Sequence, residues 1–431
     1  MIREIKNNTL YFDGCDTTEL AKQYGTPLYV FSENDIVSRF NELRACFLEK
    51  WPGSRVAYAC KAFCTPAMLK LAEREGMCID VVSGGELYAA IKAGFPAERI
   101  EFNGNNKLPS ELELAIDYGI GRIIIDSLQE LALIEKLCAA KNKRVKVLYR
   151  VTPGVQADTH DYIITGKKDS KFGLPMDDEI IYPSIKGAID SEWVDFLGVH
   201  FHVGSQLFEV RPYLEAIDVV LNLMKQTRER FGYDMTELNL GGGFGVTYTT
   251  EERKPYEYFL APAMEKIAAF CDAEGFARPA LVVEPGRSIV AEAGINLYTI
   301  GSIKDIPGVR KYVSVDGGMT DNIRHALYQA VYAGVIANKA EQPADDVVTI
   351  CGKCCESGDV LMRDAKLARA EPGDILAMFS TGAYGFSMAS NYNNNPIPAV
   401  VLVKDGRSDL IVKRQSYEDI IANAVIPERL K

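Results

Sequence analysis

Residues 55–104 read RVAYACKAFC TPAMLKLAER EGMCIDVVSG GELYAAIKAG FPAERIEFNG and carry the strongest structural signal of the chain. Short runs rich in Val, Ile and Ala alternate here with longer segments of helix-forming residues, and Gly, Pro, Ser and Thr separate them. This alternation predicts parallel strands, because parallel neighbours need a crossover connection between them.

The same alternation continues to residue 287 and gives eight strand-like runs. They span residues 55–62, 78–83, 99–104, 122–127, 145–153, 196–204, 237–243 and 280–287. Helical segments are predicted between them at residues 66–75, 85–94, 110–118, 128–141, 213–231 and 256–275. Eight strand-helix units match a (β/α)8 TIM barrel. A doubly wound sheet is the alternative, but its fingerprint GxGxxG is absent, since residues 241–245 read GGGFG.

The two ends of the chain have a different pattern. Residues 1–32 and 293–431 contain alternating strand-like runs punctuated by Gly, Pro and Asp. We therefore expect two domains: an α/β barrel over residues 33–292, and a mostly antiparallel all-β domain assembled from residues 1–32 and 293–431. The barrel would be inserted between the first strands of the β domain and the rest of it.

Composition excludes several classes of protein. The 431 residues include 48 Lys and Arg against 59 Asp and Glu, a net charge of −11 that argues against binding nucleic acid or an anionic membrane. The sequence contains no run of about 18 apolar residues, so no membrane span is predicted. Residues 1–8 lack the apolar core of a signal peptide, so we expect a cytoplasmic protein with reduced cysteines. Cys351, Cys354 and Cys355 lack the further ligands of a zinc site, and no metal is expected.

Polar and glycine residues follow the predicted strands, where a barrel carries its chemistry. Lys61 ends an apolar run, and an amine in such a setting can attack a carbonyl and form a Schiff base, although a surface lysine is the alternative. Residues 241–243 are glycines that could let backbone N–H groups approach a phosphate, or could simply form a tight turn. Glu284 and Arg287 follow the last run. Together these features predict a pyridoxal 5'-phosphate site in which Glu284 pairs with the pyridine nitrogen.

Nine motifs of the chain resemble those of a known family. They are Tyr58-Ala59-Cys60-Lys61-Ala62, Val82-Ser83-Gly84-Gly85-Glu86-Leu87, Asn103-Gly104-Asn105-Asn106-Lys107, His202-Val203-Gly204-Ser205-Gln206, Asn239-Leu240-Gly241-Gly242-Gly243-Phe244-Gly245, Glu284-Pro285-Gly286-Arg287-Ser288, Asp316-Gly317-Gly318-Met319, Cys355-Glu356-Ser357-Gly358-Asp359 and Tyr384-Gly385-Phe386-Ser387-Met388-Ala389-Ser390-Asn391-Tyr392. In these motifs, over nearly its whole length, the chain resembles the diaminopimelate decarboxylases, which are alanine-racemase-like, fold-type III pyridoxal phosphate enzymes.

The resemblance implies roles for individual residues. Lys61 would bind the cofactor as a Schiff base, and His202 would stack on its ring. The cofactor-binding residues so implied are Lys61, His202, Ser205, Gly243, Glu284, Pro285, Gly286, Arg287 and Tyr384. The resemblance also implies a homodimer with shared active sites, to which the partner subunit contributes Cys355 and Glu356. Cys355 would be a catalytic proton donor, because the pKa of a thiol can be tuned near neutrality.

The implied reaction is decarboxylation of meso-2,6-diaminopimelate to L-lysine and CO2, the last step of lysine biosynthesis. The substrate-binding residues would be Arg287, Arg324, Tyr328, Glu356 and Tyr384, since a second carboxylate needs cations such as the planar guanidinium of arginine. Two alternatives stay open. One is a decarboxylase of another basic amino acid, such as ornithine or arginine, although ornithine decarboxylases typically show Cys-Asp-Gly where this chain has Cys-Glu-Ser. The other is a catalytically silent pyridoxal phosphate-binding relative.

Two residues depart from the family pattern. Phe63 stands where the family usually has asparagine, and we expect a polar contact near Lys61 to be lost there. His325 stands where proline is common, and we expect an altered turn.

Overall fold

The computed structural model describes residues 2–155 and 170–431. The chain forms two compact units. The barrel unit comprises Ser38–Val246 and Glu252–Ile289, and the β unit comprises Met1–Val37, Thr247–Glu251 and Val290–Lys431. The chain thus leaves the β unit for the barrel unit and then returns to it.

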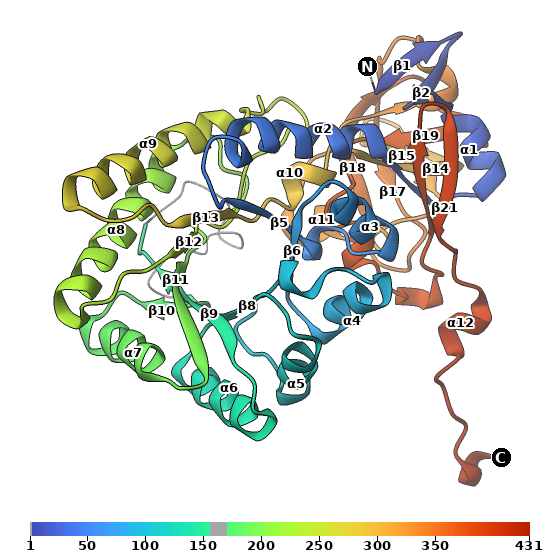
Figure 1. Ribbon diagram of the computed structural model, residues 1–431. Helices are drawn as coiled ribbons and strands as arrows, with labels where there is room; N and C mark the ends of the chain where they lie inside the picture. The colour runs from blue at the N-terminus through green and yellow to red at the C-terminus, as the bar shows by residue number, and fades with distance from the viewer. Residues whose placement is uncertain (1, 156–169) are drawn as a thin grey trace. The chain divides into compact units, whose positions relative to one another are not determined.

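Eight parallel strands close into a barrel in the barrel unit (Figure 1). They are β5 (Arg55–Ala59), β6 (Cys78–Val81), β7 (Ile100–Phe102), β8 (Arg122–Ile125), β9 (Val145–Thr152), β11 (Val194–His200), β12 (Glu237–Asn239) and β13 (Ala280–Val283). The ring closes because β13 pairs with β5 while β8 pairs with β9. A short strand, β10 (Leu174–Pro175), pairs with β9 outside the ring. The predicted (β/α)8 barrel is confirmed: seven predicted runs contain a barrel strand, and the run at residues 196–204 overlaps β11, which begins two residues earlier at Val194.

Helices surround the barrel strands (Figure 1). They are α3 (Pro66–Arg74), α4 (Gly84–Ala93), α5 (Pro109–Tyr118), α6 (Leu128–Lys141), α7 (Asp178–Asp190), α8 (Arg211–Phe231) and α9 (Tyr256–Glu274), with α2 (Glu33–Leu43) preceding the first barrel strand. The hydroxyls of Thr65, Ser83 and Ser127 accept backbone N–H groups at the starts of α3, α4 and α6, which stabilises those helix ends. The helix α7 was not among the predicted segments, and it has Pro183 in its interior as α9 has Pro262.

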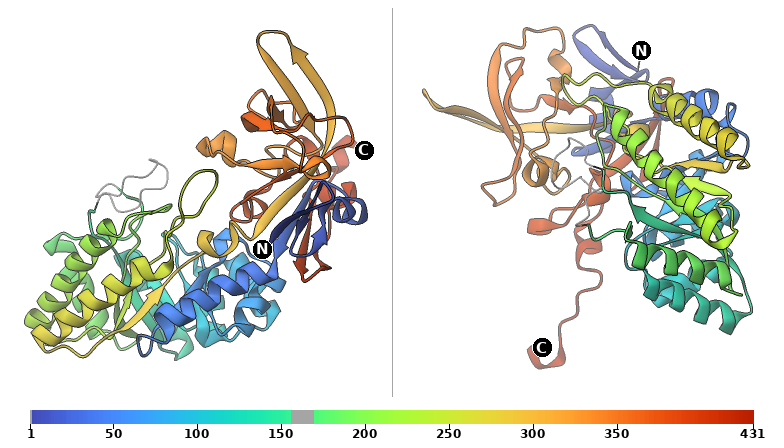
Figure 2. Two further views of the ribbon diagram at one scale, coloured as in Figure 1. Left: turned by 90° about the horizontal axis from the view of Figure 1, so that it is seen from above. Right: turned by 90° about the vertical axis from the view of Figure 1, so that its left-hand side faces the viewer.

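The β unit contains two sheets. Strands β1 (Arg3–Lys6), β2 (Thr9–Phe12) and β3 (Cys15–Asp16) form a small antiparallel sheet. The larger sheet follows the order β18 (Val360–Leu367), β17 (Asp346–Cys351), β15 (Arg310–Val315), β14 (Gly294–Ile306), β4 (Leu28–Ser32), β20 (Ala399–Lys404) and β21 (Arg407–Val412). Strand β19 (Ile375–Met378) joins β14 to β16 (Gly334–Ile336). Figure 2 shows β14 and β15 as a long hairpin. All these pairings are antiparallel except β15 with β17 and β4 with β20.

Both ends of the chain build the β unit, as predicted. The N-terminal strand β4 lies between β14 and β20, so its side chains share one apolar core with theirs. Fully buried members of that core are Phe12, Leu28, Val30, Leu297, Val401 and Val403. Burying each such side chain contributes about 1.5–3 kcal/mol.

The β unit also contains two short helices, α11 (Arg324–Tyr328) and α12 (Tyr417–Ile421), and the short helix α10 (Arg287–Val290) lies at the point in the chain where the barrel unit ends. The helix α1 (Thr17–Tyr24) begins where only strands were predicted, because the carboxylate of Asp16 accepts the N–H groups of its first turn. None of the helices within residues 2–155 and 170–431 combines the length and apolarity that a membrane span requires.

Candidate active site

Lys61 lies at the C-terminal end of the first barrel strand. It occupies a single 3-10 turn, Cys60–Ala62, that follows β5 directly. Cys60 and Ala62 are buried on both sides of it, whereas the side chain of Lys61 is exposed. The charge of Lys61 lowers the pKa of Glu284 and also lowers the pKa of His202. The amine therefore lies within electrostatic reach of both groups.

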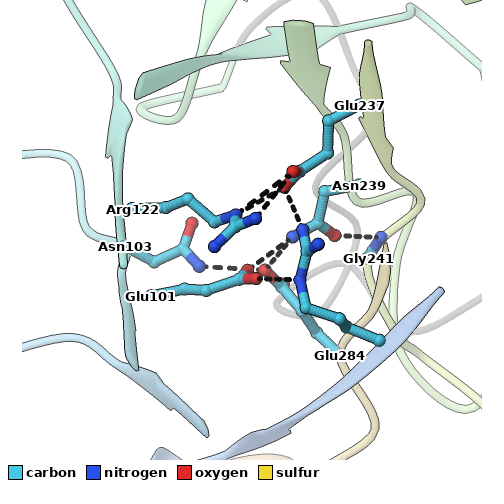
Figure 3. A network of polar contacts seen from close by, with 8 residues as sticks. Glu101, Asn103, Arg122, Glu237, Asn239, Gly241 and Glu284 are labelled. Atoms are coloured by element: carbon cyan, nitrogen blue, oxygen red, sulfur yellow. Dashed lines mark hydrogen bonds and ion pairs between the residues drawn. The ribbon is translucent and has the colours of Figure 1, made fainter. Parts of the chain in front are cut away.

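Glu284 follows strand β13 and is a buried carboxylate with three donors around it, of which Figure 3 shows Asn103 and Asn239. Its Oε1 accepts Nδ2 of Asn103 at 3.0 Å and Nδ2 of Asn239 at 2.8 Å, and its Oε2 lies 3.0 Å from Nε2 of His200. Burial by itself would raise the pKa of Glu284, but His200, Lys61 and Asn103 outweigh burial and hold the pKa well below its ordinary value. Glu284 is thus ionised at neutral pH and offers a fixed negative charge.

Asp80, in strand β6, is a second buried carboxyl close to Glu284. Nδ2 of Asn103 donates to both, at 2.7 Å to Oδ1 of Asp80. Burial and then the charge of Glu284 raise the pKa of Asp80 well above its ordinary value. The two carboxyls therefore carry about one negative charge between them, and Glu284 holds it.

His202 and the glycine run after β12 meet at the barrel mouth. The backbone N–H of Gly242 donates to Nδ1 of His202 at 3.3 Å. Burial and then the charge of Lys61 lower the pKa of His202 well below its ordinary value, so its ring is neutral. Gly243 has φ +108°, and a Cβ there would lie 2.2 Å from the carbonyl oxygen of Gly204. Only glycine fits this close approach of two backbones.

The segment 284–287 passes close to the strand that carries Lys61. The N–H of Ala59 donates to the carbonyl of Pro285 at 3.1 Å, and a Cβ on Gly286 would lie 2.9 Å from Cβ of Ala59. Arg287 then donates through Nε and Nη2 to Oγ of Ser205, at 3.2 and 3.1 Å. The structure thus brings together the predicted residues of the barrel unit, which are Lys61, His202, Ser205, Gly243, Glu284, Pro285, Gly286 and Arg287.

Arg324 is a buried cation in the β unit. Its Nη1 donates to the hydroxyls of Tyr248 at 2.9 Å and Tyr332 at 2.8 Å. The rings of Tyr328 and Tyr384 each lie 5.8 Å from its Cζ. Burial disfavours the charged guanidinium, but the two hydroxyls outweigh burial and raise the pKa of Arg324 above its ordinary value.

Among the residues that the structure describes, no carboxylate pairs with Arg324, and its Nη2 and Nε make no hydrogen bond. A buried cation whose remaining donors are uncommitted is suited to bind an anion.

Cys355 and Glu356 lie on an exposed loop of the β unit. The loop is fixed by hydrogen bonds at its base. The N–H of Cys355 donates to Oδ1 of Asn393 at 2.7 Å, and the N–H of Cys354 donates to Oδ2 of Asp359 at 2.8 Å. The side chain of Cys355 is therefore exposed on a held backbone, and that of Glu356 is exposed while its Oε1 accepts the N–H of Gly358 at 3.2 Å.

The two departures from the family pattern have simple surroundings. Phe63 is buried, and its carbonyl accepts the hydroxyl of Tyr58 at 2.8 Å. Nδ1 of His325 lies 2.9 Å from the carbonyl of Ala330, so the imidazole bridges the turn after α11.

Several residues of these clusters were given no role from the sequence. They are Asp80, Asn103, His200, Asn239, Tyr248 and Tyr332. The first four lie in or directly after barrel strands, and that position is the one signal that could have found them. Tyr248 and Tyr332 carry no comparable signal, because they meet only through the tertiary fold.

The barrel mouth fits pyridoxal phosphate. Lys61 offers an amine, Glu284 an ionised carboxylate, and the glycines around residue 243 a backbone surface open to an anion. Within the described parts of the chain, Oδ2 of Asp80 and Oδ1 of Asn103 are buried without a hydrogen-bond partner, which leaves polar atoms for a ligand to satisfy. A closed parallel barrel with this set of groups belongs to the class of pyridoxal phosphate-binding barrels.

Comparison with known proteins gives the family. Residues 33–291 match the family model for the pyridoxal binding domain of pyridoxal-dependent decarboxylases. A diaminopimelate decarboxylase of Bacillus methanolicus is 49% identical over 94% of each chain, and one of Bacillus subtilis is 47% identical over 97% of this chain and 96% of its own. The crystal structure of a diaminopimelate decarboxylase from M. jannaschii has a TM-score of 0.94 at 37% identity and covers 100% of this chain and 99% of its own. The chain belongs to the diaminopimelate decarboxylase family.

Proposed function

We propose that this protein decarboxylates meso-2,6-diaminopimelate to L-lysine and CO2, with pyridoxal 5'-phosphate as cofactor. Family membership supports the reaction, and a related crystal structure is described as a complex with L-lysine. The observation that carries the substrate assignment is Arg324, a buried guanidinium with uncommitted donors and no acidic partner among the residues described. A substrate with two carboxylates can place the one that is not lost as CO2 against Arg324, whereas ornithine has a single carboxylate.

The barrel mouth would hold the cofactor. Lys61 would bind it covalently through its amine, Glu284 would accept from the ring nitrogen, and His202 would lie against the ring. Gly243, the Pro285-Gly286-Arg287 segment, Ser205 and Tyr384 would hold the phosphate. When bound, pyridoxal phosphate supplies an electron sink for the pair left on the α-carbon as CO2 departs.

Glu284 would keep the ring nitrogen protonated, because its carboxylate is ionised and its position is fixed by three donors. The neutral Asp80 limits the negative charge beside it. His202 is neutral, so it adds no positive charge against Lys61 or the ring. These residues together hold one proton at the ring nitrogen, where the developing charge needs it.

Recognition of the substrate would use both ends of the molecule. Arg324 would bind the distal carboxylate through its free donors while Tyr248 and Tyr332 keep the guanidinium fixed. Tyr328 would line the site that binds the distal carboxylate. Arg287 would bind either a substrate carboxylate or the cofactor phosphate. Glu356 would accept from the distal ammonium group.

We further propose a cytoplasmic homodimer in which Cys355 and Glu356 act in the site of the partner subunit. Their exposure on a loop that is held at its base supports this role. Cys355 would then deliver the proton that replaces CO2 on the product carbon.

A substrate panel tests the function. The purified enzyme with added cofactor is given meso-diaminopimelate, ornithine and arginine in parallel, and released CO2 and the product are measured. We expect L-lysine from diaminopimelate and at least about 100-fold lower kcat/KM on the other two, since a missing ion pair costs a few kcal/mol. Turnover of ornithine or arginine alone would show that the substrate is wrong.

Replacing Arg324 by glutamine should lower kcat/KM on diaminopimelate by about 10- to 100-fold, mainly through a higher KM. The expected cause is loss of a charge-assisted, bidentate contact with the distal carboxylate. Steady-state kinetics measure the change. Arg310→Gln is the matched control, because Arg310 lies in the same unit but faces Thr349 and Asp364. Equal KM values for both variants would remove Arg324 from the substrate site.

Mixing two inactive variants tests the shared site. Lys61→Ala and Cys355→Ala subunits, unfolded and refolded together, should regain about one quarter of wild-type activity, because half the dimers are mixed and each has one intact site. The rate of CO2 release measures this recovery. If the mixture remains as inactive as the two variants alone, both residues act within one subunit.

A further inference from the structure

Asn239, at the end of barrel strand β12, makes three hydrogen bonds with its side chain (Figure 3). Nδ2 donates to Oε1 of Glu284 at 2.8 Å and to Oε2 of Glu101 at 3.0 Å. Oδ1 accepts the backbone N–H of Gly241 at 3.0 Å. Asn239 is completely buried, so no solvent competes with these bonds.

The amide of Asn239 has only one workable orientation. Turning it over would place Oδ1 against the ionised Glu284 and the oxygen of Glu101, and it would place Nδ2 against the N–H of Gly241. The bonds to Glu284 and to the N–H of Gly241 would then become repulsions between like groups. A buried asparagine held in this way is rigid.

Glu101, the second acceptor, lies beside a cluster of charged residues in the barrel interior, and its Oε1 makes no hydrogen bond among the residues described. Nε of Arg55 lies 3.8 Å from Oε1 of Glu101, and Nη2 of Arg55 lies 2.5 Å from Oε1 of Glu237. Arg122 makes a two-pronged pair with Glu237, with Nε to Oε1 at 2.9 Å and Nη2 to Oε2 at 3.0 Å. These residues come from strands β5, β7, β8 and β12, so the support spans the barrel interior.

We propose that Asn239 is a positioning residue that aligns the two ends of the cofactor site with each other. One side of its amide aims the Glu284 carboxylate at the ring nitrogen, and the other side fixes Gly241, the first residue of the glycine run that would hold the phosphate. Gly241 has φ +68°, a left-handed conformation that favours glycine and that a hydrogen bond from outside the run stabilises. The backbone bond from the N–H of Glu284 to the carbonyl of Gly241, at 2.8 Å, joins the same two segments but leaves the carboxylate unaimed.

This inference rests on the proposed function, and ligand affinity tests it without turnover. Full-length protein stripped of cofactor is titrated with pyridoxal 5'-phosphate and with pyridoxal, which lacks the phosphate, and the two dissociation constants are compared. The dissociation constant for pyridoxal divided by that for pyridoxal 5'-phosphate reports how much the phosphate group adds to binding. The dissociation constant for pyridoxal reports binding of the ring.

Asn103→Ala is the matched comparison, because Asn103 also donates to Glu284 but makes no bond to the glycine run. We expect Asn103→Ala to weaken the binding of both ligands by about tenfold and to leave the ratio of the two dissociation constants unchanged. Asn239→Ala should weaken the binding of pyridoxal by about tenfold and the binding of pyridoxal phosphate by about 100-fold. The dissociation constant for pyridoxal divided by that for pyridoxal phosphate should then fall about tenfold. A wild-type ratio in both variants would overturn the proposal.

Asn239→Asp separates the two halves of the proposal and keeps the size of the side chain. It retains an acceptor for Gly241 but sets an acid against Glu284, so pyridoxal binding should weaken while the ratio stays at its wild-type value. A falling ratio, or unchanged binding of pyridoxal, would count against Asn239. A wild-type protein that binds both ligands equally would instead refute the proposed cofactor site. Thermal unfolding of each stripped variant checks that it is folded.

Discussion

Replacing Lys61 by alanine should lower kcat for CO2 release by about three orders of magnitude or more. Lys61 is the one amine at the mouth whose charge reaches both Glu284 and His202 in the structure described. Its loss would remove the proposed covalent bond to the cofactor, and it removes a positive charge within electrostatic reach of an ionised carboxylate. The rate of CO2 release measures the first effect, and borohydride reduction followed by peptide mapping identifies the labelled lysine.

Lys70→Ala is the control for Lys61. Lys70 lies on α3, nine residues further along the chain, and its exposed ammonium pairs with Glu73 on the same helix. We expect that variant to keep wild-type activity and the borohydride label, since exposed pairs of this kind contribute little. A label on any lysine other than Lys61, or normal turnover without Lys61, would refute the assignment.

The second large effect is expected at Glu284. Glu284→Gln keeps the shape of the side chain and one acceptor oxygen for Asn103 and Asn239, but it removes the negative charge. Without that charge the ring nitrogen is not held protonated, and kcat should fall by about 100- to 1,000-fold, as when another preorganised electrostatic group is removed. Binding of the cofactor should weaken much less, because the phosphate contacts remain. Single-turnover CO2 release and a cofactor titration separate the two effects.

Glu101→Gln is the comparison for Glu284. Burial and then the charge of Glu237 raise the pKa of Glu101 to about 8, so the amide resembles its predominant neutral form at pH 7. The change should reduce kcat by at most about tenfold, far less than the change at Glu284. Similar losses in the two variants would mean that any disturbance of the polar barrel interior has this effect, and that Glu284 has no special role.

Much of the barrel could be read from short segments of sequence. Runs such as residues 55–62 and 122–127 are too short and too apolar for surface helices, and the intervening segments end at glycines such as Gly94 and Gly119 that terminate helices in the left-handed conformation. Position after a strand made Lys61 and Glu284 candidates, because a parallel barrel carries its chemistry at the C-terminal ends of its strands, but only the combination of several rim groups and the family motifs gave them roles.

The partners of those residues could not be read in the same way. Asn103, His200 and Asn239 come from three different strands, and each could have been an ordinary core residue. They surround Glu284 only because the closed ring turns the ends of β7, β11 and β12 toward the end of β13. The tyrosines of the β unit show the same limit, since Tyr248 lies far from Arg324 in the chain and contacts it only in the fold.

Sequence by itself determined the order of strands and helices, the assembly of the β unit from both ends of the chain, and the residues that end the barrel strands. These properties follow from local periodicity and from the rule that parallel strands need crossovers. The tertiary structure alone decided which carboxyl is ionised. Glu284 and Asp80 are both buried acids of the barrel strands or their ends, yet donors from three other strands stabilise the charge of Glu284, whereas burial and that charge keep Asp80 neutral. Electrostatic energy depends on distance in space, and distance along the chain does not report it.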